Sequence, residues 1–255
     1  MYQITPIPAF EDNYIWALCQ PEHSYCLVVD PGDADVVLQF LAQQQKQLQS
    51  ILITHHHADH TGGIAKLRHQ FPDARVIGPA AEQHLIPSLT EQVKQGDTVS
   101  LPPFNLTFDV LDLPGHTLGH IAFYSAPVLF SGDTLFSAGC GRLFEGSPAQ
   151  MWHSLQKLLA LPDNTLIYCT HEYTLANLQF ALHVDADNAA LVGYTQHCRD
   201  LRLAKQPTLP AILANEKQIN PFLRCNNKLL QKKWQKDTAL ALFTMLRAAK
   251  DQFKA

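Results

Sequence analysis

The segment ITHHHADHTGG, residues 53–63, most constrains what this chain can become. Within six consecutive positions it carries four histidines and an aspartate, namely His55, His56, His57, Asp59 and His60. Its first residue, Ile53, ends the apolar run SILI, residues 50–53, which predicts a buried β-strand. Imidazoles and a carboxylate at the end of a strand are a typical way for a rigid scaffold to present metal ligands, so we expect a metal site here.

Three further apolar runs end in the same manner. The run FDVLDL is followed by His116, PVLFSG by Asp133 and TLIYCT by His171. If these strands share one rim of their sheets, their terminal side chains converge on the first segment. A single histidine is usually a surface or core residue, but a set of this size at four strand ends indicates one common site.

The spacing within the first segment predicts two ions. His55 and His57 are two positions apart, so in an extended segment they point to the same side while His56 points elsewhere. Asp59 and His60 follow where we expect the chain to turn into a helix, and they address a second point. We assign His55, His57 and His116 to the first ion, Asp59, His60 and His171 to the second, and Asp133 to a bridging position.

The ligand types narrow the metal and its role. Imidazole and carboxylate without thiolate suit zinc, iron or manganese, and among these divalent ions we favour zinc. Structural zinc sites tend to be closed, four-coordinate and rich in thiolate. A larger set without cysteine therefore favours a catalytic centre, in which Asp133 fixes the ions and Asp59 also orients the attacking hydroxide.

The apolar pattern predicts an α/β fold class. Strands are expected at residues 24–30, 50–54, 74–78, 106–113, 120–124, 127–131 and 165–170, and helices at 33–49, 64–70 and 148–161. After His171 the periodicity is mostly helical, over 175–182, 191–205 and 238–253. We predict a catalytic domain at 1–172 and a smaller α-helical, substrate-binding domain at 173–255.

Composition argues against several other classes of protein. The formal net charge of −4 disfavours nucleic acid as a partner, and no apolar run approaches the length of a membrane span. The N-terminus has neither a basic region nor an apolar stretch typical of an export signal. The six cysteines form no CxxC pair, so we interpret them as reduced thiols of a cytoplasmic protein. We also expect the protein to be a monomer.

Four motifs together, THHHADHTGG, PGHTLGH, SGDTLF and THEYT, resemble those of the metallo-β-lactamase superfamily. Further stretches, DNYIW, AGCGRLFEG, THEYTLANLQFA, NPFLR and LRAAKDQF, resemble the glyoxalase II (hydroxyacylglutathione hydrolase) family over nearly the whole chain. The resemblance implies an αββα sandwich followed by a smaller helical domain. It also implies a binuclear thioesterase that converts S-D-lactoylglutathione to D-lactate and glutathione with a metal-bridging hydroxide, the second step of methylglyoxal detoxification.

The same resemblance implies the glutathione contacts. Matched motif by motif, they are Arg142, Phe144, Tyr173, Arg247 and Lys250. Some relatives carry tyrosine where this chain has Phe144; a main-chain contact would survive that change, and a hydroxyl contact would not. The leaving group is a thiolate, whose acid has a pKa of about 8.5, so the reaction requires no strong general acid.

Two other functions stay open. A glutathione persulfide dioxygenase shares the metal motifs, but it would use one iron and oxidise sulfur. A non-catalytic metal- or glutathione-binding protein would need no vacant bridging position between the ions. The intact ligand set and the long helical C-terminal part favour the thioester hydrolase over both.

Overall fold

The computed structural model describes residues 2–86 and 88–253. The chain folds into two compact units. One takes in the described residues up to Asp112 together with Gly119–Gly132, and the other takes in Leu113–Leu118 and the described residues from Asp133 onward. This division into units differs from the predicted domain boundary between residues 172 and 173, and that boundary stays a prediction.

The first unit contains a mixed sheet built from the N-terminal strands. Its order is β1 (Gln3–Ala9), β2 (Asn13–Cys19), β3 (Tyr25–Val29), β4 (Gln47–Leu52), β5 (Arg75–Pro79) and β6 (Glu91–Val93). The pairs from β1 to β3 are antiparallel and those from β3 to β6 are parallel. Parallel pairing aligns the carboxyl ends of β4 and β5, so the loop after β4 leaves the sheet at a defined edge.

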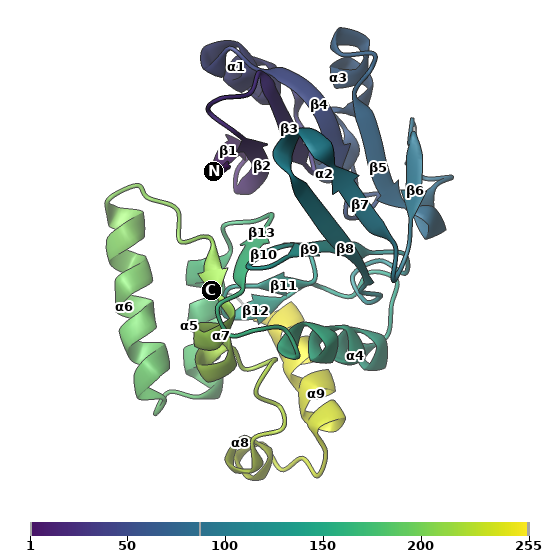
Figure 1. The fold of residues 1–255 in the computed structure, drawn as a ribbon. Helices are drawn as coiled ribbons and strands as arrows, with labels where there is room; N and C mark the ends of the chain where they lie inside the picture. The colour runs from purple at the N-terminus through teal and green to yellow at the C-terminus, as the bar shows by residue number, and fades with distance from the viewer. Residues whose placement is uncertain (1, 87, 254–255) are drawn as a thin grey trace. The chain divides into compact units, whose positions relative to one another are not determined.

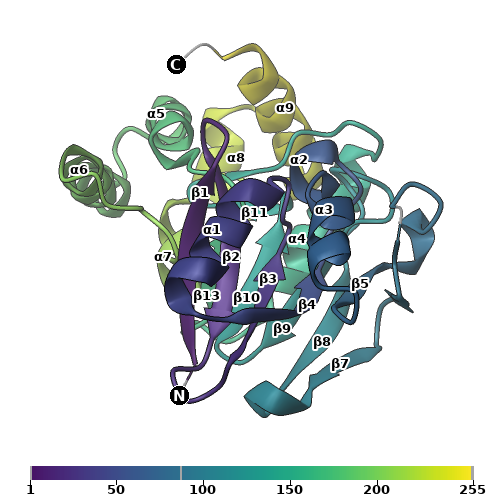
Figure 2. The same ribbon diagram turned by 90° about the horizontal axis from the view of Figure 1, so that it is seen from above.

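Two helices cover one face of this sheet. α1 (Ala34–Gln44) and α3 (Ile64–Gln70) lie side by side on it, as both views show (Figure 1, Figure 2), and the short α2 (Ala58–Thr61) and the 3₁₀ turn Ala80–Glu82 connect neighbouring elements. Buried apolar residues of the strands and helices share one core, among them Val28, Ile51, Val76, Val37, Leu41 and Leu67. This burial is the main stabilisation of the unit.

The first unit is completed by an antiparallel meander. It consists of β7 (Thr98–Leu101), the 3₁₀ turn Pro102–Phe104, β8 (Leu106–Asp112), β9 (Ile121–Ser125) and β10 (Val128–Gly132). Each strand pairs with the next in sequence. Phe108, Phe123 and Phe130 are fully buried, with ring centroids 5.7–6.5 Å apart from Phe108. Aromatic packing thus fixes the strands that lead toward His116 and Asp133.

The second unit is mostly helical. Its elements are the hairpin β11 (Leu135–Phe136) and β12 (Gly139–Cys140), the pair β13 (Leu166–Cys169) and β14 (Ala211–Ile212), and the helices α4 (Pro148–Leu159), α5 (Thr174–Val184), α6 (Ala189–Leu203), α7 (Leu213–Ile219), α8 (Lys228–Lys233) and α9 (Ala239–Gln252). Leu178, Leu191 and Ile219 belong to a core formed by α5, α6 and α7. Trp152 and Phe243 join α4 to α9, with ring centroids 5.7 Å apart.

The α/β class and the helical C-terminal part are confirmed, and helix caps explain several boundaries. Ser147 and Gln150 form a capping box at the start of α4, with Pro148 in the first turn. The predicted helix over 33–49 is too long. Gln45 adopts a left-handed φ of 53° that ends α1, and β4 begins at Gln47. In the described part of the chain, no helix combines the length and apolar character needed to cross a bilayer.

The expectation that all cysteines are reduced thiols is wrong for one pair. Cys19 and Cys26 are opposite each other in the β2–β3 ladder, with Cα atoms 4.5 Å apart, and they form a disulfide. The sequence gives no sign of it because β2 was not among the predicted strands. The other cysteines, Cys140, Cys169, Cys198 and Cys225, are buried and take no part in this disulfide.

The disulfide predicts how many cysteines react with a thiol reagent. Of the six cysteines in the sequence, about four should react with a thiol reagent in the unfolded, unreduced protein, since a disulfide withholds two. All six should react after reduction. The Cys19→Ser/Cys26→Ser variant is the control and should give the same count with and without reductant. Six reactive thiols in protein purified without reductant would contradict the pairing.

Candidate metal centre

A buried carboxylate fixes the chain where it leaves β4. Asp30 accepts hydrogen bonds from the main-chain N–H of Thr54 at 2.8 Å and from its hydroxyl at 2.7 Å. Oδ2, the oxygen that accepts from the hydroxyl, also lies 3.2 Å from Nδ1 of His60. Asp30 and His60 are both buried. Asp30 therefore sets the direction of the histidine segment, although no motif in the sequence analysis singled it out.

The histidines after β4 alternate in direction as their spacing predicts. Nε2 of His55 and Nδ1 of His57 are 3.0 Å apart. Two ligands bound at about 2.1 Å to one ion in tetrahedral geometry are about 3.4 Å apart, so this separation suits a shared ion. His56 turns the other way, and its Nδ1 lies 3.0 Å from Oε2 of Glu82.

The short helix α2 carries the next two candidate ligands. Oδ2 of Asp59 and Nε2 of His60 are 3.3 Å apart. The side-chain amide of Asn13 donates to Oδ2 of Asp59 at 3.0 Å and orients the carboxylate. A side chain at Gly32 would place its Cβ 1.9 Å from the carbonyl oxygen of Asp59, so only glycine allows the preceding loop to approach α2 this closely.

In the second unit, Asp133 faces two histidines with its two oxygens. Oδ2 lies 3.3 Å from Nε2 of His116, and Oδ1 lies 3.5 Å from Nε2 of His171. The hydroxyl of Thr170 donates to Oδ1 at 2.5 Å. All of these side chains are buried. A carboxylate whose oxygens serve different histidines has the geometry expected of a bridge between two ions.

The hydrogen bond made by His116 fixes its tautomer and tests whether a cation fits. Nδ1 lies 2.8 Å from the carbonyl oxygen of Arg142, and because a carbonyl only accepts, Nδ1 carries the proton. In the neutral ring Nε2 then presents a lone pair toward the carboxylate of Asp133. A lone pair and an anionic oxygen repel each other unless a cation lies between them, so the donor set fits a metal ion.

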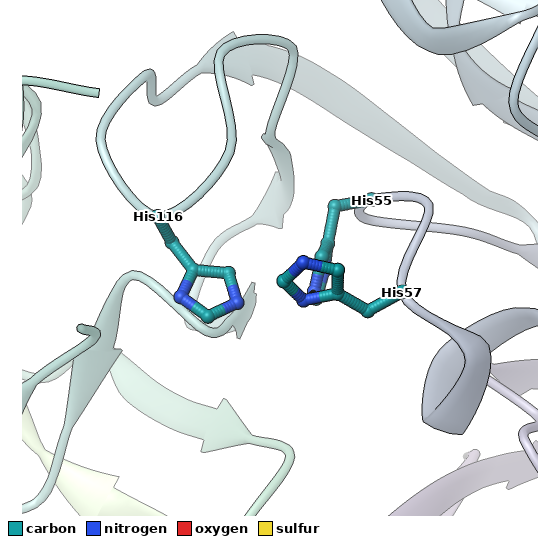
Figure 3. A group of neighbouring side chains, drawn as sticks. All are labelled: His55, His57 and His116. Atoms are coloured by element: carbon teal, nitrogen blue, oxygen red, sulfur yellow. Dashed lines mark hydrogen bonds between the residues drawn. The ribbon is translucent and has the colours of Figure 1, made fainter. Parts of the chain in front are cut away.

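The candidate ligands fall into three sets whose nitrogen or oxygen atoms lie within 4.8 Å of one another. The sets are His55, His57 and His116; His55, His60 and Asp133; and Asp59, His60 and His171. Figure 3 shows the imidazole rings of the first set turned toward one another. The first and third sets are the trios assigned to the two ions from the sequence. Imidazole and carboxylate at these separations are suited to divalent metal ions.

Two predicted substrate residues lie beside candidate ligands. The ring of Tyr173 stacks on that of His171, with centroids 4.6 Å apart and an interplanar angle of 5°. Phe144 meets the ring of His116 edge-on at 5.2 Å. Phe144 is 61% exposed and Tyr173 is 37% exposed. Aromatic surface that is exposed next to the candidate ligands is available to a bound molecule.

The predicted cationic contacts differ in exposure. The side chain of Arg142 is 61% exposed, and its guanidinium lies 5.5 Å from the ring centroid of Phe144. Arg247 is buried; it donates to the carbonyl oxygen of Cys140 at 2.7 Å and to Asp251 at 2.9 Å. Asp251, which the sequence analysis missed, also lies 3.9 Å from Nε of Arg142 and so stands between the two guanidinium groups.

Lys250 is half-buried on α9. Its ammonium donates to the carbonyl oxygen of Ala176 at 3.3 Å and lies 5.7 Å from the ring centroids of Phe180 and Phe253. Burial lowers the pKa of Lys250, with the nearby Arg247 charge acting in the same direction. An added anion would relieve this repulsion between the two cations.

Comparison with known proteins first defines the class. Residues 13–171 match the metallo-β-lactamase superfamily, and residues 172–253 match the family described as hydroxyacylglutathione hydrolase C-terminus. The structure of ETHE1 from Myxococcus xanthus shares the fold, with a TM-score of 0.66, 24% identity and 98% coverage of both chains. TTHA1623 in a di-iron-bound form has a TM-score of 0.54 and 29% identity, over 66% of this chain and 91% of that one.

Full-length relatives then define the family. A protein of Photobacterium profundum named hydroxyacylglutathione hydrolase is 51% identical over 99% of this chain and 100% of its own length. A protein of Vibrio cholerae with the same name is 50% identical over the same shares. The chain therefore belongs to the hydroxyacylglutathione hydrolase family of metal-dependent hydrolases.

The geometry at Asp133 predicts a loss of metal on substitution. Asp133→Asn exchanges one anionic oxygen for an amide nitrogen, which cannot ligate a cation. Loss of a second-shell partner alone typically weakens metal affinity by about 10- to 100-fold, so loss of the bridge should weaken it by at least about 100-fold. Metal content of the purified protein, measured by mass spectrometry, checks this result. Asp109→Asn, at an exposed position of β8, is the matched control, and equal metal content in both variants would contradict the assignment.

Proposed function

We propose that this protein hydrolyses S-D-lactoylglutathione and related glutathione thioesters to D-lactate and glutathione, the second step of methylglyoxal detoxification. The observation that carries the proposal is similarity over the full length to proteins named hydroxyacylglutathione hydrolase. That similarity includes the C-terminal part, residues 172–253, as well as the superfamily part that bears the candidate ligands. We also propose that residues 1–172 form the catalytic domain and that residues 173–255 form a helical domain that binds the substrate.

The proposed centre holds two divalent ions. His55, His57 and His116 would hold one, Asp59, His60 and His171 the other, and Asp133 both. We favour zinc, because four-coordinate sites with imidazole and carboxylate ligands suit it. Iron is the main alternative, since one structural relative is described in a di-iron-bound form, and manganese is a further one.

When bound, the two cations supply a hydroxide at neutral pH and a Lewis acid for the developing oxyanion. The chain's own residues orient these groups. The main-chain carbonyl of Arg142 keeps the proton of His116 on Nδ1, so that Nε2 would present its lone pair to a metal ion. Asn13 turns Oδ2 of Asp59 to a fixed position, where this carboxylate would also orient the nucleophile. Because the leaving thiol has a pKa of about 8.5, no residue is needed as a strong general acid.

The proposed binding residues match the chemistry of glutathione, a tripeptide with carboxylates at its ends. The exposed guanidinium of Arg142 offers a bidentate partner for one carboxylate. Tyr173 and Phe144 would line the approach to the thioester, and Lys250 and Arg247 supply further positive charge on α9. Phe144 cannot donate a hydroxyl hydrogen bond, so its contribution is limited to ring and main-chain contacts.

We also propose that the enzyme acts as a cytoplasmic monomer without nucleic-acid or membrane partners. The net charge of −4 supports the absence of a nucleic-acid partner. A disulfide between Cys19 and Cys26 is unusual in a reducing compartment. Six reactive thiols would therefore support the cytoplasmic location, and four would argue against it.

A thioester panel with metal analysis on the same sample tests the proposed reaction. We expect release of one thiol per S-D-lactoylglutathione, loss of activity on chelation, and recovery on addition of zinc. The two metal ions would together supply the hydroxide nucleophile, so the metal-free protein should be inactive. Full activity after thorough metal removal would overturn the proposal. Oxygen consumption with glutathione persulfide, in place of thioester cleavage, would instead establish the dioxygenase.

Arg142 should contribute to binding and not to the chemical step. Arg142→Ala removes a partly exposed ion pair worth about 1 kcal/mol, so we expect KM for the thioester to rise about fivefold with kcat within about twofold. Lys232→Ala, which removes an exposed cation on α8, is the matched control and should change neither constant. A fall in kcat at unchanged KM would argue against the role given to Arg142.

A further inference from the structure

The hairpin β11–β12 joins two parts of the proposed active site. It begins two residues after Asp133 and ends two residues before Arg142. The main-chain N–H of Gly141 donates to the carbonyl oxygen of Thr134 at 3.1 Å and closes the base of the hairpin. A shift of the hairpin would therefore move the candidate bridging carboxylate and the exposed guanidinium together.

The tip of this hairpin is held by a buried carboxylate from α7. Oε1 of Glu216 accepts from the hydroxyl of Ser137 at 2.9 Å, and Oε2 accepts from the main-chain N–H of Ala138 at 2.8 Å. Ala138 has a φ of 54°, a left-handed conformation that a non-glycine residue adopts only when its surroundings hold it. Glu216 is completely buried, and it supplies the acceptor that fixes this turn.

Two side-chain amides also form hydrogen bonds to the main chain of the hairpin. The amide nitrogen of Asn220 lies 3.0 Å from Oε2 of Glu216, 3.2 Å from the carbonyl oxygen of Phe136 and 3.0 Å from that of Gly139. Asn177 of α5 donates to the carbonyl oxygen of Ser137 at 3.1 Å. The main-chain groups at the tip, which a ladder of two-residue strands leaves open, are thus bonded to side chains of the C-terminal helical region.

A ring of β11, next to the tip, packs against two rings beside the candidate centre. The ring of Phe136 packs edge-on against His171, with centroids 5.9 Å apart, and against Tyr173 at 5.3 Å. A Cβ at Gly139 would meet the side-chain amide of Asn177 at 2.5 Å, so the chain approaches α5 as closely as a glycine allows. The hairpin is therefore confined between the helical side chains and the rings beside the centre.

A purely structural contact would not favour a carboxylate in this place. Burial raises the pKa of Glu216 to about 7, so keeping it ionised costs free energy that an apolar residue would not. Its donors, Ser137, Ala138 and Asn220, all favour the ionised form. A site retains such a group where a particular main-chain conformation has to be specified.

We propose that Glu216 is a positioning residue for the metal centre, acting with Asn220 and Asn177 through the hairpin on Asp133 and Arg142. This inference rests on the proposed function, because it concerns the same centre. The C-terminal helical region then has a second role beyond substrate contact: it sets the position of a ligand that precedes it in the chain by more than a helix and a strand.

The test is Glu216→Gln, which keeps the volume but replaces one acceptor oxygen with a donor. In folded protein well below its melting temperature, we expect kcat/KM for S-D-lactoylglutathione to fall about 10- to 100-fold, with both kcat and KM affected. Metal affinity, measured by competition with a chromogenic chelator, should weaken by a similar factor. Asn177→Ala leaves Glu216 intact and should change the same quantities in the same direction, which keeps the proposal testable if Glu216→Gln does not fold.

The matched control is Asn227→Ala. Asn227 caps α8 through the N–H groups of Leu229 and Leu230, so its loss destabilises the same helical region without touching the hairpin. It should lower the melting temperature and leave kcat, KM and metal affinity unchanged. If Glu216→Gln behaves like Asn227→Ala, Glu216 is only structural and the inference is wrong. If the wild type binds metal but cleaves no thioester, the proposed function fails, and the chelator competition still decides the inference.

Discussion

The interaction on which the rest depends is that of one carboxylate with two imidazoles. The oxygens of Asp133 lie 3.3 Å from His116 and 3.5 Å from His171, all within the protein interior. With Nδ1 of His116 protonated, an anionic oxygen and a nitrogen lone pair face each other, which is unfavourable without a cation. The fold brings these groups together, and a metal ion bound between them would supply the cation that favours the arrangement. Metal binding is in this way coupled to the conformation of the chain, so the loops that position the ligands also affect metal affinity.

Three loops around the centre are held in position by the same kind of hydrogen bond. In each, a buried carboxylate remote in sequence accepts a main-chain N–H: Asp30 from Thr54, Glu82 from Gly119 and Glu216 from Ala138. A loop that leaves a strand has lost its ladder partners, and a buried N–H without an acceptor costs about 1–3 kcal/mol. A carboxylate satisfies that donor and also fixes the direction in which the loop leaves. Apolar contacts could bury the same loops, but they would not specify main-chain position so narrowly.

The sequence predicted the features that are local and missed those that are not. Strand ends could be placed because apolar runs stop at them, and the candidate ligands follow each stop within a few residues, as His171 follows β13. The strands β1 and β2 were not among those predicted: the prolines in PIPAF disfavour a strand, and the apolar run YIWALC was not assigned. Helix α1 was overextended because a left-handed residue such as Gln45 has no apolar signature. Asp30, Glu82 and Glu216 were beyond reach, since each acts on a main-chain group 24, 37 and 78 positions away, respectively.

The predicted cationic contacts differ in their surroundings, while their roles in binding stay a proposal. Arg247 was expected beside Lys250 as a glutathione contact, yet it is buried and bonded to the carbonyl oxygens of Cys140 and Gly141. Arg142 remains the exposed guanidinium, resting on the ring of Phe144 and near Asp251. A pocket that recognises a hydroxyl or amide by hydrogen bonding rejects analogues that lack it by about 10⁴-fold or more, whereas an apolar contact discriminates by about 10- to 200-fold. Because Phe144 has no hydroxyl, selection by the proposed contacts at this edge would rest on the charge of Arg142 and on ring contact. Discrimination among acyl groups that leave the glutathione carboxylates unchanged is then expected to come from the space beside His116 and Tyr173, where the thioester would lie.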